Sequence, residues 1–312
     1  MNSLSRINEK PLLRATYHCL IAIVVWASST SASDKTLLED MNYRRNRGEW
    51  MRSAKSPLAL AGLFWLKVGK NTFGTDPSND FVLPAGSAPG RVGHFELMGS
   101  TASVDVKSGI AVKLNGEQVS RQELINDATS VPPDVLELNH LRMKVIQRGG
   151  KLAVRLTDLK NPRLLAFKSL DFYEIDPELR VEAEFVPYQP PKKIRVASIA
   201  GYAEELECPG VARFRVGGTT VQLEPVFETA GDTKLYFMFK DSTNGRETYG
   251  GGRYLYSALP SNGRVKLNFN QAHNPYCAYN SYSTCQIPPL QNWLKVPIRA
   301  GEKKYTESKQ AR

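Results

Sequence analysis

The stretch that decides the fold of the first half of the chain reads Phe-Val-Leu-Pro-Ala-Gly-Ser-Ala-Pro-Gly-Arg-Val-Gly-His-Phe-Glu-Leu-Met-Gly-Ser-Thr-Ala-Ser-Val-Asp-Val, residues 81–106. Short apolar runs alternate here with Gly, Pro and polar residues, as they do throughout residues 58–145. This pattern is typical of strands joined by tight turns. It predicts strands at residues 81–83, 95–97, 104–106, 111–114 and 141–146. Asn115-Gly116 predicts a hairpin turn, because this dipeptide favours the left-handed backbone.

The second half repeats the pattern after a link rich in aromatic and proline residues, around residues 172–173 and 186–191. Strands are expected at residues 180–186, 194–202, 211–216, 219–225 and 234–239. Gly217-Gly218 lies between two of them as a second hairpin turn.

A helix is predicted ahead of both β-rich parts, over about residues 35 to 54, with Asp34 as its cap. Its apolar positions recur at near-helical spacing and are expected to face the body of the protein: Leu37, Leu38, Met41 and Trp50. The predicted fold is therefore mainly β, with an N-terminal helix followed by two β-rich units, the second a small sandwich or open barrel.

Residues 1–32 have the layout of a secretory signal peptide. Arg6, Lys10 and Arg14 precede the apolar run 19–26, and small residues near Ala32 suit a cleavage site. The run is far shorter than the roughly 18 to 20 residues of a membrane span. Cleavage would remove three basic residues and Glu9, lowering the formal charge of +10 by 2 to about +8. We expect a periplasmic or secreted protein without a transmembrane segment after cleavage; the alternative is an uncleaved tether.

Basic residues recur at spacings that suit the outer faces of strands: Arg142, Lys144, Arg148, Lys151 and Arg155. We interpret them as solvated surface and expect no nucleic-acid partner.

The domain plan is a signal peptide at 1–32, a helix at 33–56, a first β-rich unit at 57–170 and a second at 171–312.

Four segments of the first unit occur in the order seen in forkhead-associated (FHA) domains, which are β-sandwiches: Gly69-Lys70-Asn71, Asn79-Asp80-Phe81-Val82-Leu83, Gly93-His94-Phe95-Glu96-Leu97 and Asn115-Gly116-Glu117-Gln118-Val119. FHA domains bind phosphothreonine through an arginine beside the first glycine and a serine three residues before the histidine. This chain has Lys70 or Asn71 and Arg91 at these places. The resemblance therefore implies the sandwich and not the phosphopeptide site.

Residues 237–303 are dense in polar, glycine and aromatic residues. Asp241-Ser-Thr-Asn-Gly245 follows a predicted strand, and turn chemistry accounts for it as well as a ligand does, because Asp accepts backbone hydrogen bonds and Gly takes a positive φ. The three glycines Gly250-Gly-Gly252 would allow a ligand to approach the backbone closely, and they precede Arg253, whose fork suits a carboxylate or phosphate. The spacing matches no nucleotide-binding loop.

A series of motifs resembles domain-of-unknown-function family 1684, a group of bacterial proteins: Gly62-Leu-Phe-Trp-Leu, Asn71-Thr-Phe-Gly, Asp241-x-Thr-x-Gly, Gly252-Arg253, Phe269-Asn270-x-Ala272-x-Asn274-Pro275-x-Cys277-Ala278, Asn292 and Gly301-Glu302-Lys303. The Asn-Pro-x-Cys block is the most specific of them. The resemblance covers nearly the whole mature chain. It implies the domain plan and the place of a site, and no reaction.

We predict that the ligand-binding residues are Asp241, Arg253, Asn270, Asn274, Asn292 and Glu302. An ion pair between Glu302 and Arg253 is one way to close such a site. The tyrosines of this region could stack on sugar rings, or could simply fill the β core.

Three interpretations of the cysteines remain open. An oxidising compartment favours a disulfide between Cys277 and Cys285, with Cys208 free. Alternatively, Cys277 is a nucleophile activated by His273. A metal site from these residues would have uneven spacing, so we expect no metal and no cofactor.

Three functions remain possible on the sequence alone. The first is an exported protein that binds a small or envelope-derived polar ligand at the predicted Arg/Asp/Asn site. The second is a hydrolase of cell-envelope material that acts through Cys277 and His273 or through Asp241 and Glu302. The third is a structural or adaptor protein.

Overall fold

The computed structural model describes residues 32–229 and 231–306. The predicted signal peptide lies outside the described residues, except for Ala32 at its end. The fold is mainly β, as predicted, with one N-terminal helix followed by open, mostly antiparallel sheets. In the described part of the chain, no helix combines the length and apolarity that a membrane crossing requires.

The first β-rich unit is a sandwich of two sheets, here called the N-terminal sandwich. One sheet contains β1 (Leu60–Trp65), β6 (Val112–Leu114), β7 (Glu117–Val119), β9 (Leu136–Leu138), β10 (Leu141–Arg148) and β11 (Lys151–Asp158), in the order β1-β11-β10-β9-β6-β7. The other contains β2 (Gly69–Gly74), β3 (Phe81–Val82), β4 (Gly93–Met98), β5 (Thr101–Val106) and β8 (Arg121–Leu124), in the order β3-β2-β4-β5-β8.

The core of this sandwich is built from the apolar positions that alternate along its strands. Phe73, Phe81 and Phe95 are in ring contact at its centre. Asn115 and Gly116 both have positive φ between β6 and β7, which confirms the predicted hairpin turn.

The second β-rich unit, here called the C-terminal unit, contains two sheets. The larger holds β12 (Arg180–Ala197), β13 (Ala203–Val216), β14 (Thr219–Leu223) and β17 (Arg264–Asn268), in the order β14-β13-β12-β17. The smaller is the hairpin of β15 (Lys234–Phe239) and β16 (Arg253–Ala258). Their apolar faces share a core that includes Phe214, Phe239 and Phe269.

The proline-rich segment 186–191, predicted as part of a link, lies inside β12. The pairing of β12 with β13 stops at Pro187 and resumes at Lys192, so the residues between them stay extended without a regular ladder. Proline has no N–H to donate, which explains the break in the ladder. Two predicted strands are therefore one long strand, and the actual change of unit occurs in residues 159–179, which contain the short helix α2 (Pro162–Leu165).

Helix α1 (Ala32–Met51) begins and ends slightly before the predicted bounds, and it docks through a different face. Leu37, Leu38 and Met41 are 43%, 48% and 53% exposed, so the predicted apolar face mostly points to solvent. The docked face is polar, and its residues recur at helical spacing: Asp40, Tyr43, Arg44 and Arg47.

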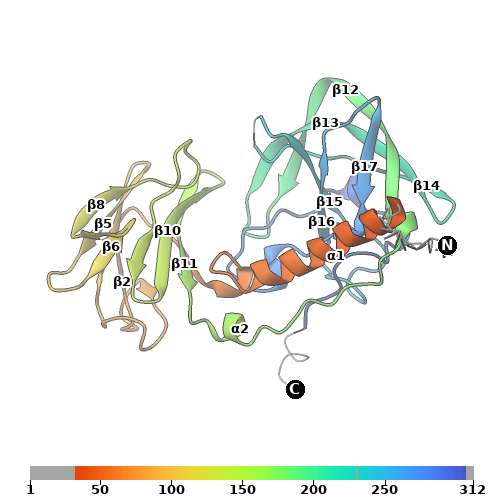
Figure 1. Ribbon diagram of the computed structural model, residues 1–312. Coiled ribbons are helices and arrows are strands. Elements are labelled where there is room, and N and C mark those ends of the chain that lie inside the picture. Colours follow the sequence, from red (N-terminus) through yellow and green to blue (C-terminus); the bar gives the residue numbers. More distant parts are fainter. Residues whose placement is uncertain (1–31, 230, 307–312) are drawn as a thin grey trace, which may run out of the picture.

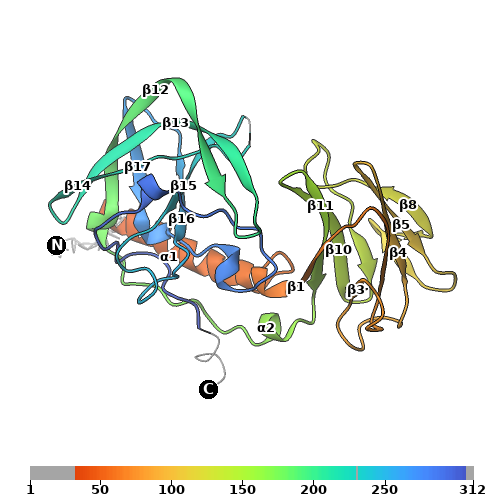
Figure 2. The same cartoon turned by 180° about the vertical axis from the view of Figure 1, so that it is seen from behind.

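Asp40, Tyr43 and Arg47 have distant partners in the C-terminal unit, and Arg44 donates to Tyr173 O in the segment that leads to it. Asp40 is completely buried and accepts hydrogen bonds from Arg180 Nε (3.1 Å), Asn268 Nδ2 (2.7 Å) and Gln271 Nε2 (3.1 Å). Figures 1 and 2 show α1 lying along the C-terminal unit, with its last turn directed towards the N-terminal sandwich. The helix therefore belongs to the C-terminal unit although it precedes the sandwich in sequence.

Candidate functional site

Asp241 and Arg253 form an ion pair inside the C-terminal unit. Arg253 Nη2 lies 2.7 Å from Asp241 Oδ2, and neither side chain is exposed. The same guanidinium donates to the carbonyl oxygens of Ile298 and Ala300, and Asp241 Oδ1 accepts from the backbone N–H and hydroxyl of Thr243. The turn chemistry expected after β15 is present, and the arginine fork binds the protein's own backbone.

Glu302 pairs with Arg47 of α1 and not with Arg253, so the suggested Arg253–Glu302 ion pair is wrong. Arg47 Nε lies 2.7 Å from Glu302 Oε1, while Oε2 accepts from Asn274 N at 2.8 Å and Tyr279 Oη at 2.7 Å. Burial opposes the charged carboxylate, but attraction by Arg47 and these hydrogen bonds hold its pKa below the usual value. Glu302 thus stays ionised and fixes the backbone at Asn274.

Asn270 and Asn292 act as buried backbone clamps. The amide of Asn270 accepts from Asp176 N at 2.9 Å and donates to Asp176 O at 2.8 Å. Asn292 does the same with Glu224 N and O, both at 2.8 Å, and also donates to Met238 O. Both side chains therefore satisfy backbone groups of this chain, as a buried amide must.

The predicted ligand-binding residues are therefore not gathered around one hollow. All six have internal partners, because Asn274 Nδ2 also donates to Lys303 O at 2.8 Å. Asn274 alone among the six lines the cavity described next. Three successive glycines were expected to let a ligand approach; instead Gly252, at φ +99°, packs its backbone against Phe239 O and the ring of Pro288.

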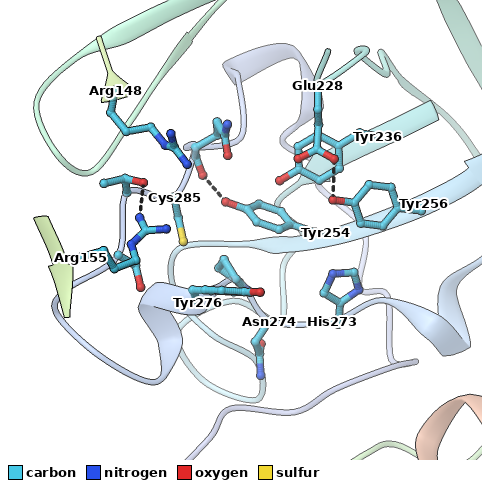
Figure 3. Close-up of a pocket in the computed structure, with 14 residues that line it drawn as sticks. Arg148, Arg155, Glu228, Tyr236, Tyr254, Tyr256, His273, Asn274, Tyr276 and Cys285 are labelled. Atoms are coloured by element: carbon cyan, nitrogen blue, oxygen red, sulfur yellow. Dashed lines mark hydrogen bonds between the residues drawn. The ribbon is translucent and has the colours of Figure 1, made fainter. Parts of the chain in front are cut away.

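A cavity of about 290 Å³ lies where the N-terminal sandwich meets the C-terminal unit (Figure 3). We call it the tyrosine cavity. Its wall consists of Arg148 and Arg155 from the sandwich and, from the C-terminal unit, of Glu228, Tyr236, Tyr254, Tyr256 and the segments 273–276 and 283–286.

The two arginines differ in how their charge is neutralised. Arg148 forms a two-pronged pair with Asp127, with Nη1–Oδ1 2.9 Å and Nη2–Oδ2 2.8 Å. Arg155 has no carboxylate within ion-pair distance among the described residues. Its Nη2 donates to Thr284 Oγ1 at 3.2 Å, and its buried Nε has no hydrogen-bond partner. Burial, and next the charge of Arg148, lower the pKa of Arg155, which remains cationic because arginine starts so high.

The other wall is aromatic. Tyr256 stacks on Tyr236, with ring centres 4.9 Å apart, and lies nearly parallel to His273 at 5.9 Å. The hydroxyl of Tyr256 donates to Glu228 Oε2 at 2.8 Å, and burial raises the pKa of that carboxyl. Glu228 therefore bonds to a tyrosine and does not neutralise Arg155.

His273 presents a neutral imidazole at the edge of this wall. Its Nδ1 lies 3.2 Å from Tyr43 Oη and 3.3 Å from Gln271 O, which places the ring proton on Nδ1 because Gln271 O can only accept. Burial, followed by the charge of Arg47, lowers its pKa to about 4. No described residue hydrogen-bonds to Nε2, which is thus free to accept from a ligand.

The cysteines are adjacent to each other and separate from the histidine. Cys277 N donates to Cys285 Sγ at 3.3 Å, and the thiols of Cys208, Cys277 and Cys285 are all free, so the predicted disulfide is not formed in this structure. A hydrogen bond from Cys285 is the main cause that lowers the pKa of Cys277 to about 7. No hydrogen bond joins Cys277 to His273 in the described structure, and in Figure 3 Cys285 lies at the opposite end of the cavity from His273.

The second proposed catalytic pair, Asp241 and Glu302, is also not assembled: each carboxylate has its own arginine and its own set of donors. Within residues 32–229 and 231–306, no three side chains of the metal-binding types form a group suited to a metal ion.

Sequence reasoning missed Arg155. We interpreted it as solvated surface because it belongs to an outward-facing row, and the row does face outward from the sandwich, but part of it lies against the C-terminal unit. The available signal was the recurrence of basic residues at strand spacing, since like charges that face each other across a ladder are unfavourable.

Comparisons with known proteins find matches to parts of the chain. Residues 165–303 match the family model described as "Protein of unknown function (DUF1684)". The match lies within the part of the chain that contains the C-terminal unit, and it confirms the resemblance drawn from the motifs over these residues. The motifs suggested a resemblance over nearly the whole mature chain, whereas the family model matches this part. A search of curated proteins finds no match.

Three solved structures resemble parts of the chain. One is the solution NMR structure of an uncharacterised protein from Haloarcula marismortui, with 29% identity over 44% of this chain and 77% of that one, and a TM-score of 0.38. Another is the FhaA FHA domain complexed with the intracellular domain of Rv3910, with 18% identity, 29% and 82% coverage, and a TM-score of 0.22. A third, from work on phosphothreonine-dependent FHA domain interactions, has 18% identity, 30% and 79% coverage, and a TM-score of 0.22.

Proposed function

We propose that this protein binds a small anionic ligand in the tyrosine cavity, with an oxyanion group of the ligand on Arg155. One observation carries the proposal: Arg155 is a largely buried cation at the wall of a cavity, and no carboxylate within residues 32–229 or 231–306 forms an ion pair with it. Removing an unpaired charge from water costs several kcal/mol. A carboxylate or phosphate placed on the guanidinium would offset that cost through two parallel hydrogen bonds.

The rest of the wall suits the body of such a ligand. Tyrosine rings offer a flat apolar surface for a sugar or other ring. Because each tyrosine also carries a polar hydroxyl, the polar groups of the ligand do not have to be fully desolvated. Nε2 of neutral His273 accepts one hydrogen bond from a hydroxyl. A cavity of about 290 Å³ is at the small end of the range for small-molecule sites, so the part enclosed is about the size of one ring with its substituents.

Two of the residues first predicted to touch the ligand, Glu302 and Arg253, hold segments that lead to this wall. Glu302 fixes Asn274 N, where the wall segment 273–276 passes. Arg253 fixes the carbonyls of Ile298 and Ala300, just before Glu302. They would influence binding by holding segments in place, and not by contact.

The proposal includes export. It rests on the leader within residues 1–32, for which cleavage near Ala32 is predicted. Mass spectrometry of the N-terminus tests this cleavage, with protein purified from the cell envelope and from the medium. In such an oxidising compartment we also propose that Cys277 and Cys285 join in a disulfide, because the two residues are already in contact.

The test compares Arg155→Met with Lys151→Met, which removes the same charge from an exposed position on the same strand. Thermal unfolding is followed with inorganic phosphate, acetate and glucuronate at constant ionic strength. We expect the parent and K151M to be stabilised by at least one of these anions and R155M by none. Equal stabilisation of R155M, or no stabilisation of the parent by any of them, would overturn the proposal.

The same variants separate binding from a structural role. If the role of Arg155 is to bind a ligand, R155M without ligand should be at least as stable as the parent. In this variant a packed apolar side chain replaces a buried, unpaired charge. A large loss of stability in R155M would instead assign the arginine to the contact between the two units.

A further inference from the structure

A second cavity, of about 570 Å³, lies on the other side of Arg155 and Tyr276, since these two residues line both cavities. We call it the lysine cavity. Its wall includes residues 54–56, which follow α1, and Arg142, Lys144 and Arg155 from β10 and β11.

Lys144 and Arg155 are direct partners across the ladder of β10 and β11. Directly opposed residues of antiparallel strands have Cβ atoms roughly 4.5 to 5.5 Å apart, and like charges at such positions destabilise the pair. Lys144 has no ion-pair partner among the residues that the structure describes, and it is only partly exposed. Burial, followed by the charge of Arg155, lowers the pKa of Lys144.

Asp127 attracts both Lys144 and Arg155, but its ion pair is with Arg148. Arg142 is neutralised by Glu137, with 2.8 Å between Nη2 and Oε2. Lys55 adds another positive charge to the wall, and it has no ion pair within the described chain. Remaining parts of the wall are apolar, among them Leu60, Val135 and Met143. The unbalanced charge of the lysine cavity is therefore concentrated at Lys144 and Lys55, beside the shared Arg155.

We propose that Lys144 is the centre of a second oxyanion subsite, and that the ligand is an elongated molecule with two acidic groups, one on each side of Tyr276. This inference rests on the proposed function, because Arg155 serves as the boundary between both subsites. The ligand class is a phosphorylated or carboxylated sugar or short oligomer, in which the ring lies in the tyrosine cavity and the second acidic group reaches Lys144. A molecule with a single acidic group would fill one subsite only.

The test measures dissociation constants by calorimetry at constant ionic strength for inorganic phosphate and for linear alkane-α,ω-diyl bisphosphates of increasing length. The variants are Lys144→Met, Arg155→Met and, as a control, Lys113→Met, which removes an exposed lysine from the same sheet. The parent and K113M should bind one bisphosphate length at least about tenfold more tightly than phosphate, because the second contact is intramolecular. K144M should lose this gain while its affinity for phosphate stays unchanged.

The outcomes distinguish the two proposals. If R155M loses affinity for both probes and K144M binds the bisphosphates as the parent does, the second subsite is wrong and the proposed function stands. If R155M binds both probes like the parent, the proposed function fails as well. If K144M loses as much affinity for phosphate as for the bisphosphates, Lys144 and Arg155 bind the same anion, and the two-subsite arrangement is also overturned. Lys144→Arg, which keeps the charge, should retain the gain and shows that K144M is not merely misfolded.

Discussion

Arg253 and Asp241 form an ion pair from which solvent is completely excluded, and the same guanidinium holds the carbonyls of Ile298 and Ala300. The hairpin of β15 and β16 is thereby tied to the segment that leads to Glu302. A buried pair of this kind is sensitive to loss of one partner, because the other charge is left without compensation.

Arg253→Met should therefore lower the free energy of unfolding by about 3 to 5 kcal/mol. Urea denaturation measures this loss. Arg299→Met is the matched control, because Arg299 forms an ion pair with Glu247 in which both side chains remain exposed, so little change is expected. Similar stabilities for the two variants would show that the buried pair does not hold this segment.

Folding stability should depend on pH through His273. Its pKa of about 4 lies below the value of about 6.5 in the unfolded chain. The contribution of neutral His273 to the free energy of unfolding is therefore complete above pH 6.5. It is lost as the pH falls, because the imidazole is protonated in the unfolded state but not in the folded state. Between pH 7 and 5 the loss should be about 2 kcal/mol.

Urea denaturation of the parent and of His273→Asn at pH 7, 6 and 5 measures this dependence. The variant should be less sensitive to pH in this window. Glu302, whose pKa is lowered, loses its contribution only at more acidic pH and so does not interfere. Parallel pH profiles for the two proteins would assign the dependence to other groups.

Alkylation should distinguish the three cysteines. The pKa of Cys277 is lowered to about 7 by its hydrogen bond with Cys285, whereas burial raises that of Cys208 to about 11. Iodoacetamide at pH 7.5 should therefore label Cys277 first, because the thiolate is the reactive form. Peptide mass spectrometry identifies the site, and Cys277→Ser should remove the fast phase.

Oxidised glutathione tests the disulfide in the same assay. It accepts the two electrons and two protons of Cys277 and Cys285 and is reduced, and both residues should then resist alkylation while Cys208 remains free under denaturing conditions. Initial labelling at Cys208, or continued labelling of Cys277 after oxidation, would contradict this assignment.

Glycine substitutions test whether the three-glycine segment is structural. Gly252 has φ +99°, and an added Cβ would lie 2.6 Å from Phe239 O and 2.7 Å from Pro288 Cγ. Gly252→Ala should cost about 1 to 3 kcal/mol. Gly250→Ala is the control, because its nearest contact would be an ordinary 3.6 Å and its φ is not positive. Thermal unfolding compares them; a stable G252A would leave the segment available for another role.

The sequence predicted much of the fold because strand periodicity and turn dipeptides are local signals. The hairpins at Asn115-Gly116 and Gly217-Gly218 depend on backbone preferences of two residues and lie where expected. The docking face of α1 could not be predicted in this way. Asp40 is buried because Arg180, Asn268 and Gln271 converge on it from positions far along the chain.

The candidate site was harder to predict for the same reason. Asp241 and Arg253 are residue types typical of a ligand site. However, the guanidinium of Arg253 also binds the backbone near residue 300, and no local sequence pattern predicts this contact. Arg155, conversely, has the pattern of an exposed strand residue, and only the approach of the C-terminal unit gives it a wall. The charge of a residue can be read from sequence, but the presence of its counter-ion depends on tertiary structure.

The pairing of Arg47 with Glu302 joins positions that are 255 residues apart. Chains are synthesised and threaded across membranes from the N-terminus, and contacts of such long range can form only after the intervening chain is available. Helix α1 is made long before Glu302, so its docking surface is incomplete until that part of the chain has followed. The polar face of α1, which carries Asp40, Arg44 and Arg47, therefore obtains its buried partners only in a late step of folding.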